Sequence, residues 1–345
     1  MSGPLSIFFL DAGRKFFGVP AVKSLLDCAA KAGLDMMQLY FSDNQGFRLA
    51  LEDMRLTTEF GTYDLTPALG DGYAQEDKAP DGSGRFWRQD DMEEILAYAR
   101  RLGVELIPAL NMPGHMGAIL EAFPHLRYPG SRSSIDLRNP EAVAFAKALA
   151  YKYASYFAGL GCRFFNLGAD EFANDLGSMG FDVIYKDGTM QYFVPFLNDL
   201  AAMVCGLGMT PMAFNDGIYY NNDTTTYGSI DNRIWVQYWI AGWNGYSPAS
   251  AKTLEEQGFP LVNACHLWYC GAGCRDWEER RRVAESIDCR MFDKETFISD
   301  PAAGMLCCWC DHADFYGPDE GKALAEALPP VIAAFGQAMK NVKNL

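Results

Sequence analysis

Two adjacent carboxylic acids, Asp170 and Glu171, follow a short apolar run that ends at Leu167. Because neighbouring carboxylates raise the cost of ionising both, we expect one of them to be protonated near neutral pH and to serve as an acid. Successive side chains at a strand end diverge, so the two groups can act on different atoms of one substrate. The alternative is a structural cap, the commoner role of a single acidic residue after a strand.

Charged and aromatic side chains also follow the other apolar runs. The charged or titratable members include Asp11, Arg14, Asp43, His115, Asp216 and Asp311, and the aromatic members include Trp239, Trp268, Tyr269 and Trp309. Carboxylates among aromatic walls suit a sugar, because rings stack on its axial C–H faces while its hydroxyls donate to carboxylates. A phosphate site would instead need a glycine-rich turn at a helix amino terminus. We therefore expect a small-molecule carbohydrate as ligand.

The elements that position these residues alternate along the chain as short apolar runs and longer segments of helical periodicity, which is typical of βα units. We expect strands over residues 5–10, 36–41, 104–110, 163–167, 211–215, 234–238, 260–264 and 305–309. We expect helices over 21–32, 90–102, 140–160, 192–207 and 322–338, with stops at Gly33, Gly103, Gly161 and Gly208. The pattern predicts an α/β fold, a single-domain (β/α)8 TIM barrel over residues 1–345, with loop insertions near 56–88 and 221–232. The active site of such a barrel forms at the carboxyl ends of its strands.

The composition limits the classes of partner. With 345 residues and 49% hydrophobic content, the chain can bury one large core. Its formal charge of −15 disfavours nucleic acid, which requires basic patches. There is no apolar run of about 18 residues and no signal-peptide pattern, so we expect no membrane association and a cytoplasmic location. The sequence does not indicate an oligomeric state.

The ten cysteines raise the question of a metal site. Four potential ligands lie close together in the sequence, namely Cys265, His266, Cys270 and Cys274. No pair among them has the Cys-x2-Cys spacing with which one turn supplies two zinc ligands. Three further cysteines crowd an expected strand, where thiols act as small apolar side chains: Cys307, Cys308 and Cys310. We expect neither a metal nor an organic cofactor.

Taken together, these residues resemble those of glycoside hydrolase family 20, the β-N-acetylhexosaminidases. The shared pieces are LDAGR at 10–14, FSDNQGFR at 41–48, IPALNMPGH at 107–115, LGADE at 167–171, Trp239, LWY at 267–269, and 304–311 around Trp309. The Gly-x-Asp-Glu and Met-Pro-Gly-His elements are the most specific. The resemblance spans the chain from Leu10 to Asp311.

This resemblance implies exo-acting, substrate-assisted hydrolysis of terminal β-linked GlcNAc or GalNAc with retention, an exception to the usual two-carboxylate schemes. Glu171 would be the general acid and then the base for water. Asp170 would orient the acetamido nitrogen and offset its developing positive charge. Tyr269 would donate to the acetamido oxygen.

The resemblance also implies a set of substrate-binding residues. Arg14 and Asp311 would hold the outer hydroxyls of the terminal sugar. Trp239 and Trp309 would form the walls of the acetamido pocket and the sugar platform. His115 would support the acid from the third strand.

The chain departs from the family pattern at several positions. Pro108 to Asn111 reads Pro-Ala-Leu-Asn where the family commonly has Pro-Glu-Ile-Asp, so charge behind the acid is missing. Gly271 stands where an aspartate is common, and Phe214 where a tryptophan is common. These changes favour a more permissive outer pocket that accepts both amino sugars.

Two other function classes remain open from the sequence. One is a barrel enzyme of different chemistry, such as a classical two-carboxylate glycosidase or a metal-assisted lyase that uses Asp43, His115 and Glu171. The other is a sugar-binding barrel without catalysis, for which the missing third-strand acids are the only support. Barrels host many chemistries, so the fold does not decide among these classes.

Overall fold

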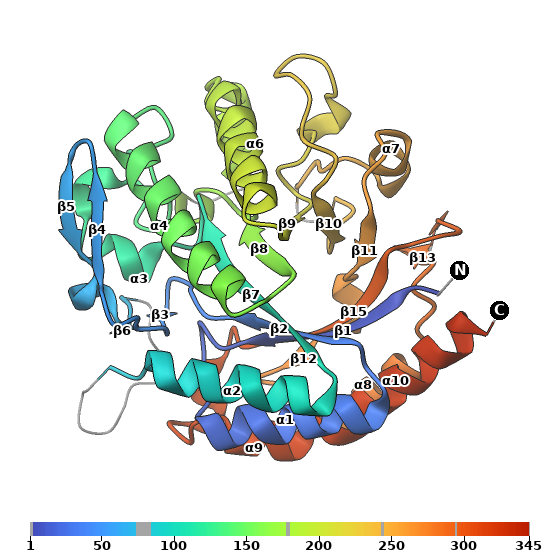
Figure 1. Cartoon of the computed structure of the whole chain (residues 1–345). Helices are drawn as coiled ribbons and strands as arrows, with labels where there is room; N and C mark the ends of the chain where they lie inside the picture. Colours follow the sequence, from blue (N-terminus) through green and yellow to red (C-terminus); the bar gives the residue numbers. More distant parts are fainter. Residues whose placement is uncertain (1–2, 74–83, 177–179, 243–244, 294, 345) are drawn as a thin grey trace.

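Eight parallel strands form a closed barrel in this computed structural model, which describes residues 3–73, 84–176, 180–242, 245–293 and 295–344. The strands are β1 (Leu5–Asp11), β2 (Met36–Tyr40), β7 (Glu105–Met112), β8 (Phe164–Gly168), β9 (Thr210–Phe214), β10 (Trp235–Tyr238), β11 (Leu261–Asn263) and β15 (Ala303–Trp309). They pair in that order, and β15 pairs with β1 from Leu5 with Ala303 to Leu10 with Cys308, which closes the sheet. All eight expected strands and the (β/α)8 TIM barrel are confirmed (Figure 1).

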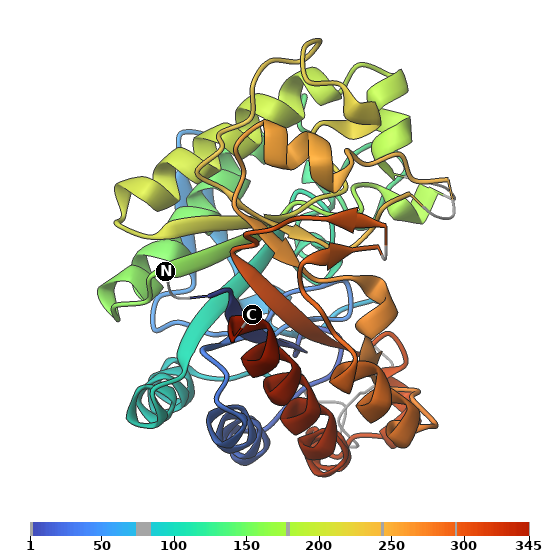
Figure 2. The same cartoon turned by 90° about the vertical axis from the view of Figure 1, so that its right-hand side faces the viewer.

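Helices form the outer layer of the barrel (Figures 1 and 2). The main ones are α1 (Val19–Ala32), α2 (Gln89–Leu102), α4 (Pro140–Gly159), α6 (Met190–Gly206), α7 (Ala251–Glu256), α8 (Trp277–Glu285), α9 (Lys322–Ala327) and α10 (Pro329–Lys343). Gly33 and Gly103 end α1 and α2 in the left-handed conformation, as their positions predicted. The single helix expected over 322–338 is wrong: the chain forms α9 and α10, divided at Leu328, because the prolines at 329 and 330 cannot donate hydrogen bonds back into α9.

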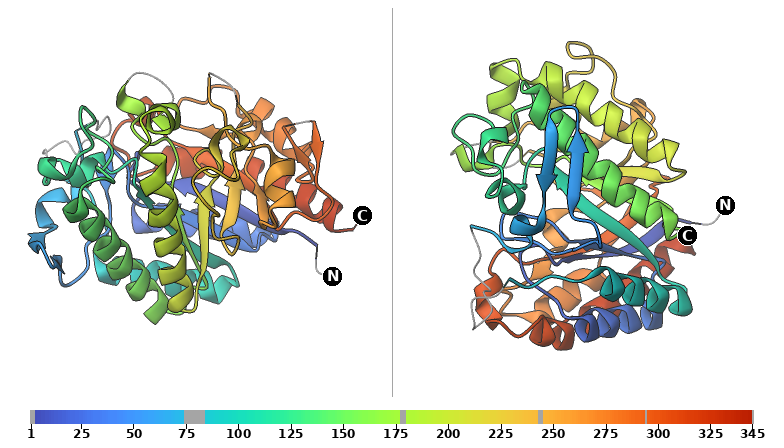
Figure 3. Two further views of the ribbon diagram at one scale, coloured as in Figure 1. Left: turned by 90° about the horizontal axis from the view of Figure 1, so that it is seen from above. Right: turned by 60° about the vertical axis from the view of Figure 1, so that its left-hand side comes forward.

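The first expected insertion is more regular than its composition suggested. It carries the antiparallel hairpin β4 (Arg55–Thr58) and β5 (Gly61–Asp64), which lies beside α4 (Figure 3). The Tyr63 hydroxyl donates to Glu141 of α4 over 2.8 Å. Residues 74–83 of the insertion lie outside the described part of the chain. The second insertion, 221–232, is irregular as expected, and between β9 and β10 the described residues form one 3-10 turn (Tyr220–Asn222) and no α-helix.

The inside of the barrel is a packed core. Apolar residues fill it together with a buried polar group in which Gln38 and Asn166 both donate to Gln237, over 3.2 and 2.8 Å. Cys307 and Cys308 are fully buried in β15, as expected for small apolar side chains, and all ten cysteines are unpaired thiols. Within the described residues, no helix has the length and apolar character needed to cross a bilayer.

Candidate active site

A cavity of about 300 Å³ opens at the carboxyl ends of the strands. Its walls are formed by Arg14, Asp170, Glu171, Trp239, His266, Tyr269, Trp309 and Asp311. Seven of the eight residues predicted for the site therefore line one cavity, and the eighth, His115, lies behind the two acids. A larger hollow of about 530 Å³ lies at the opposite end of the barrel, around Leu5 and Glu105, away from these groups.

The backbone around the two acids is held in an unusual conformation. Ala169 and Glu171 have φ angles of 66° and 46°, in the left-handed region that residues other than glycine rarely adopt. Two buried side chains fix this turn: Asn111 accepts from the Ala169 amide over 3.1 Å, and Asp216 accepts from the Glu171 amide over 2.7 Å. Strain of this kind concentrates at functional sites and persists only where the surroundings enforce it.

Asp170 is almost fully buried and is fixed by Asn111. Because the Asn111 oxygen accepts from the Ala169 amide, its nitrogen must face Asp170, to which it donates over 2.5 Å. The same nitrogen donates to the Tyr40 hydroxyl over 2.9 Å, and that hydroxyl donates to Asp43 over 2.7 Å. Burial raises the pKa of Asp170, and the His115 charge and the Asn111 amide oppose the rise. The donor that Asn111 supplies thus favours the ionised carboxylate.

Glu171 lies nearer the solvent than Asp170, with side-chain exposures of 26% and 8%. His115 places Nε2 3.2 Å from Glu171 Oε2 and Nδ1 3.2 Å from Asp43 Oδ2. Burial works to raise the pKa of Glu171, but the His115 hydrogen bond and charge outweigh it, and the pKa is lowered. Burial likewise opposes charge on His115, but Asp43 and Asp170 raise its pKa well above 6.5. In the free protein, the pKa of Asp170 is therefore raised and that of Glu171 is lowered. The resemblance to the family, in contrast, gives Glu171 the role of general acid.

The position of His115 also bears on metal-assisted chemistry through Asp43, His115 and Glu171. The two carboxylates face opposite nitrogens of the imidazole ring. Ligands on opposite edges of one ring cannot converge on a single ion. His115 therefore lies between the two carboxylates, within 3.2 Å of each.

Trp309 forms the floor of the cavity. Its ring packs on Phe9, with centroids 4.3 Å apart, and against Tyr40, Phe214 and Tyr269 at 5.7 to 6.0 Å. Within the described residues, neither the buried Trp309 indole N–H nor the buried Tyr269 hydroxyl makes a hydrogen bond of acceptable geometry. Both are therefore preformed donors at the cavity.

Arg14 connects the floor to the rim. Its guanidinium lies 5.2 Å from the Trp309 ring centroid and pairs with Asp11 over 2.9 Å and Asp43 over 3.4 Å. The exposed Asp311 lies 3.7 Å from it. Burial, partly offset by Arg14, raises the pKa of Asp11 to about 6. Arg14 and Asp311 together offer a donor and an acceptor to hydroxyls at the cavity edge.

Trp239 forms a side wall whose orientation is fixed from behind. Its indole N–H donates to Asp216 over 3.0 Å, and its backbone amide donates to Asn215 over 2.9 Å. Asp216 also accepts from the Glu171 amide, so one buried carboxylate joins the wall to the acid. Asp216 therefore supports the site from behind the cavity wall.

Two residues at the site were not predicted. Tyr246, in the loop after β10, donates to Glu171 Oε1 over 3.0 Å and accepts from Asn174 over 2.5 Å. His266 lines the cavity one residue after Cys265. The sequence places Tyr246 and His266 after strands β10 and β11, but many other loop residues also follow strands, so position alone does not predict a role at the site.

Comparison with known proteins places this geometry in a family. The model of the glycosyl hydrolase family 20 catalytic domain matches residues 7–293. Among curated proteins, the lacto-N-biosidase of Bifidobacterium bifidum is 24% identical over 71% of this chain, and a β-hexosaminidase of Vibrio furnissii is 25% identical over 47% of this chain. The chain spans only 21% and 28% of those two proteins.

Solved structures agree. A structure of the pneumococcal virulence factor StrH, described in terms of N-glycan recognition and hydrolysis, superposes with a TM-score of 0.87 at 28% identity. It covers 99% of this chain, which spans 84% of that one. A Streptomyces plicatus β-hexosaminidase bound to its product GlcNAc has a TM-score of 0.66 at 19% identity over 96% of this chain and 63% of that one, which supports the fold. The chain therefore belongs to glycosyl hydrolase family 20, a family of glycoside hydrolases.

Proposed function

We propose that this enzyme is an exo-acting, retaining β-N-acetylhexosaminidase that removes terminal GlcNAc or GalNAc by substrate-assisted catalysis. The observation that carries the proposal is the different surroundings of the adjacent acids. Asp170 is enclosed and held by an amide donor, whereas Glu171 faces the solvent side and contacts a histidine and a tyrosine. Asp170 thus has a fixed donor that favours its charged form against the effect of burial, and Glu171 has two side chains close by with which it can exchange a proton.

Asp170 suits the orienting role. The ionised carboxylate accepts from the substrate's acetamido N–H and offsets the positive charge that develops as the acetamido oxygen attacks the anomeric carbon. The Tyr269 hydroxyl is a buried donor available to that oxygen. A group that stabilises charge only as it develops lowers the barrier without tightening the ground state.

Glu171 suits proton transfer through His115. We expect a proton to pass between His115 Nε2 and Glu171 Oε2, which lie 3.2 Å apart. Substrate binding displaces water from the cavity, which favours the neutral acid and neutral imidazole over the ion pair. Glu171 then protonates the leaving oxygen and later accepts a proton from the attacking water.

The size of the cavity favours exo action. About 300 Å³ lies at the lower end of the range of roughly 300–1,000 Å³ for ligand pockets, which suits a single sugar ring better than an extended chain. The names of the relatives, lacto-N-biosidase and β-hexosaminidase, support a substrate of this class.

The test is release of p-nitrophenol from the β-GlcNAc and β-GalNAc glycosides by the wild type, Asp170→Asn and Glu171→Gln, with a GlcNAc-thiazoline inhibitor alongside. We expect turnover by the wild type, inhibition by the thiazoline, and losses of about 10²–10⁴-fold in each variant. Asp199→Asn is the matched control, because Asp199 is exposed on α6 and its ion pair with Lys147 lies at the surface.

Each failure points to another function. Azide rescue of a carboxylate variant that yields the α-glycosyl azide would indicate a covalent nucleophile and a classical two-carboxylate mechanism. Binding of GlcNAc by a folded wild type without turnover of either glycoside would indicate a sugar-binding barrel.

A further inference from the structure

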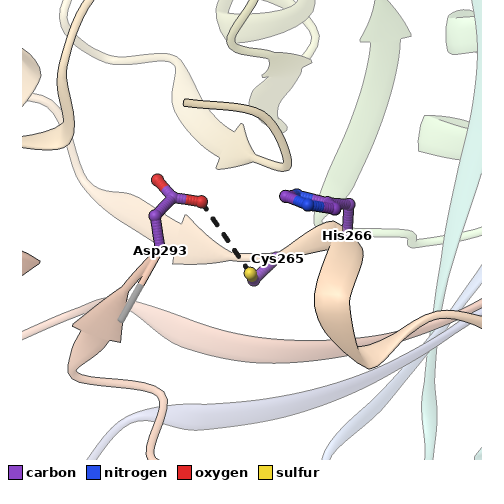
Figure 4. A group of neighbouring side chains, drawn as sticks. All are labelled: Cys265, His266 and Asp293. Atoms are coloured by element: carbon purple, nitrogen blue, oxygen red, sulfur yellow. Dashed lines mark hydrogen bonds between the residues drawn. The ribbon is translucent and has the colours of Figure 1, made fainter. Parts of the chain in front are cut away.

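Three side chains of metal-ligand type converge at the end of β11. Cys265 and His266 follow that strand, and Asp293 follows the short strand β13 (Met291–Phe292), 28 residues after Cys265. Their ligand atoms all lie within 4.8 Å of one another. Figure 4 shows the three side chains side by side, with the Cys265 thiol directed at the Asp293 carboxylate.

One buried amide ties the two segments together. Asn263 is fully buried, and its nitrogen donates to the carbonyls of Cys289 and Met291, each over 3.0 Å. Its oxygen accepts from the Cys265 amide over 3.3 Å. The strand end that carries Cys265 and the turn that carries Asp293 are therefore fixed relative to each other, which preorganises the three side chains.

The distance between the sulfur and the carboxylate oxygen is close to that of a tetrahedral zinc site. With Zn–S near 2.3 Å and Zn–O near 2.1 Å, a sulfur and an oxygen on one ion are about 3.6 Å apart. The Cys265 sulfur lies 3.8 Å from the Asp293 oxygen. A His266 ring nitrogen lies within 4.8 Å of both atoms, and thiolate, imidazole and carboxylate are all zinc ligands.

We propose that Cys265, His266 and Asp293 form a binding site for a zinc-type divalent cation in the wall of the sugar cavity. His266 is a lining residue of that cavity, so the fourth coordination position is accessible to water or a ligand. Spacing along the sequence does not reveal the site, because only two of its three ligands are neighbours in the chain. Cys270 instead donates to the Cys307 carbonyl over 3.4 Å, and the third ligand comes from Asp293.

The experiment is a titration of the chelator-treated protein with cobalt(II), followed by displacement with zinc. We expect one equivalent to bind, with the visible bands of tetrahedral cobalt, a sulfur-to-cobalt charge-transfer band, and loss of both on adding zinc. Cys265→Ser should abolish the charge-transfer band. Asp293→Asn should raise the dissociation constant at least about tenfold, since loss of even a ligand's partner typically has that effect.

Cys162→Ser is the matched control, because Cys162 is also a buried thiol but lies at the opposite end of the barrel. It should bind cobalt as the wild type does. Wild-type protein that binds no stoichiometric cobalt, or a charge-transfer band that persists in a folded Cys265→Ser variant, would overturn the proposal. The titration requires no turnover, so its result is independent of the proposed hydrolysis.

Discussion

Replacing Asn111 with leucine tests how the protein keeps Asp170 ionised. Leucine has a similar shape but no donor, so Asp170 loses the 2.5 Å hydrogen bond that favours its charged form. A hydrogen bond to a charged group contributes about 1.5–3 kcal/mol. At about 1.4 kcal/mol per pKa unit, the pKa of Asp170 should rise by about one to two units.

The sign of the effect on activity follows. Only ionised Asp170 can offset the charge on the acetamido group. The acidic limb of kcat/KM should therefore move to higher pH by about one to two units, as the pKa of Asp170 does. Below the limb kcat/KM should fall about 10- to 100-fold, and well above it only the smaller loss from the missing Ala169 contact should remain. The assay is the pH profile of kcat/KM on the preferred p-nitrophenyl glycoside.

Asn111→Asp is the matched partner. An aspartic acid there donates to Asp170 only while it is protonated, and two charges within 2.5 Å of each other repel at higher pH. Its losses should therefore appear on the alkaline side, opposite to those of the leucine variant. A folded leucine variant whose profile matches that of the wild type would refute this role of Asn111.

Three further predictions follow from the geometry. His115→Gln weakens the hydrogen bond and removes the charge that lower the pKa of Glu171, so that pKa should rise. The alkaline limb of kcat/KM should then move to higher pH while its maximum falls, and an unmoved limb would contradict this role of His115. Tyr269→Phe should lower kcat about 10²–10³-fold. The urea midpoint should stay within error of the wild type, because the hydroxyl has no hydrogen-bond partner among the described residues. A large loss of stability would mean that the hydroxyl has a structural role. Gly168→Ala should lower the free energy of unfolding, measured by urea denaturation, by more than about 2 kcal/mol. The added Cβ would lie 1.8 Å from Asn111 Oδ1, and the φ of Gly168 is +76°. Gly159→Ala is the control that should be nearly neutral, because no atom lies within 4 Å of the Cβ added there.

The barrel could be predicted from the sequence because each strand is a short apolar run and several are preceded by a glycine stop. In a parallel barrel, both faces of a strand are buried, so the strands read as continuous apolar segments, as in FFNLG of β8. The candidate site could be predicted as well, since the residues after the strands must meet at one end of the barrel. Seven of the eight predicted site residues line the cavity there.

The remaining features depend on contacts between distant segments. Tyr246 reaches Glu171 across 75 residues of sequence, and Asp293 reaches Cys265 across 28, in both cases from loops without a distinctive pattern. The pKa directions of Asp170 and Glu171 differ because burial prevails at Asp170, whereas the His115 hydrogen bond and charge prevail over burial at Glu171, and adjacency of the two acids does not reveal this. The break between α9 and α10, by contrast, could have been predicted from the two prolines at 329 and 330.

The central claim is that the substrate's own acetamido oxygen is the nucleophile, held by Asp170 and Tyr269. The most direct test measures kcat/KM on p-nitrophenyl β-glycosides whose 2-acetamido group carries zero, one, two or three fluorines. Fluorination makes the oxygen less nucleophilic without moving it, so the account predicts a steep, continuous fall along the series. Rates that do not change with fluorination would contradict the account and point to a nucleophile supplied by the protein.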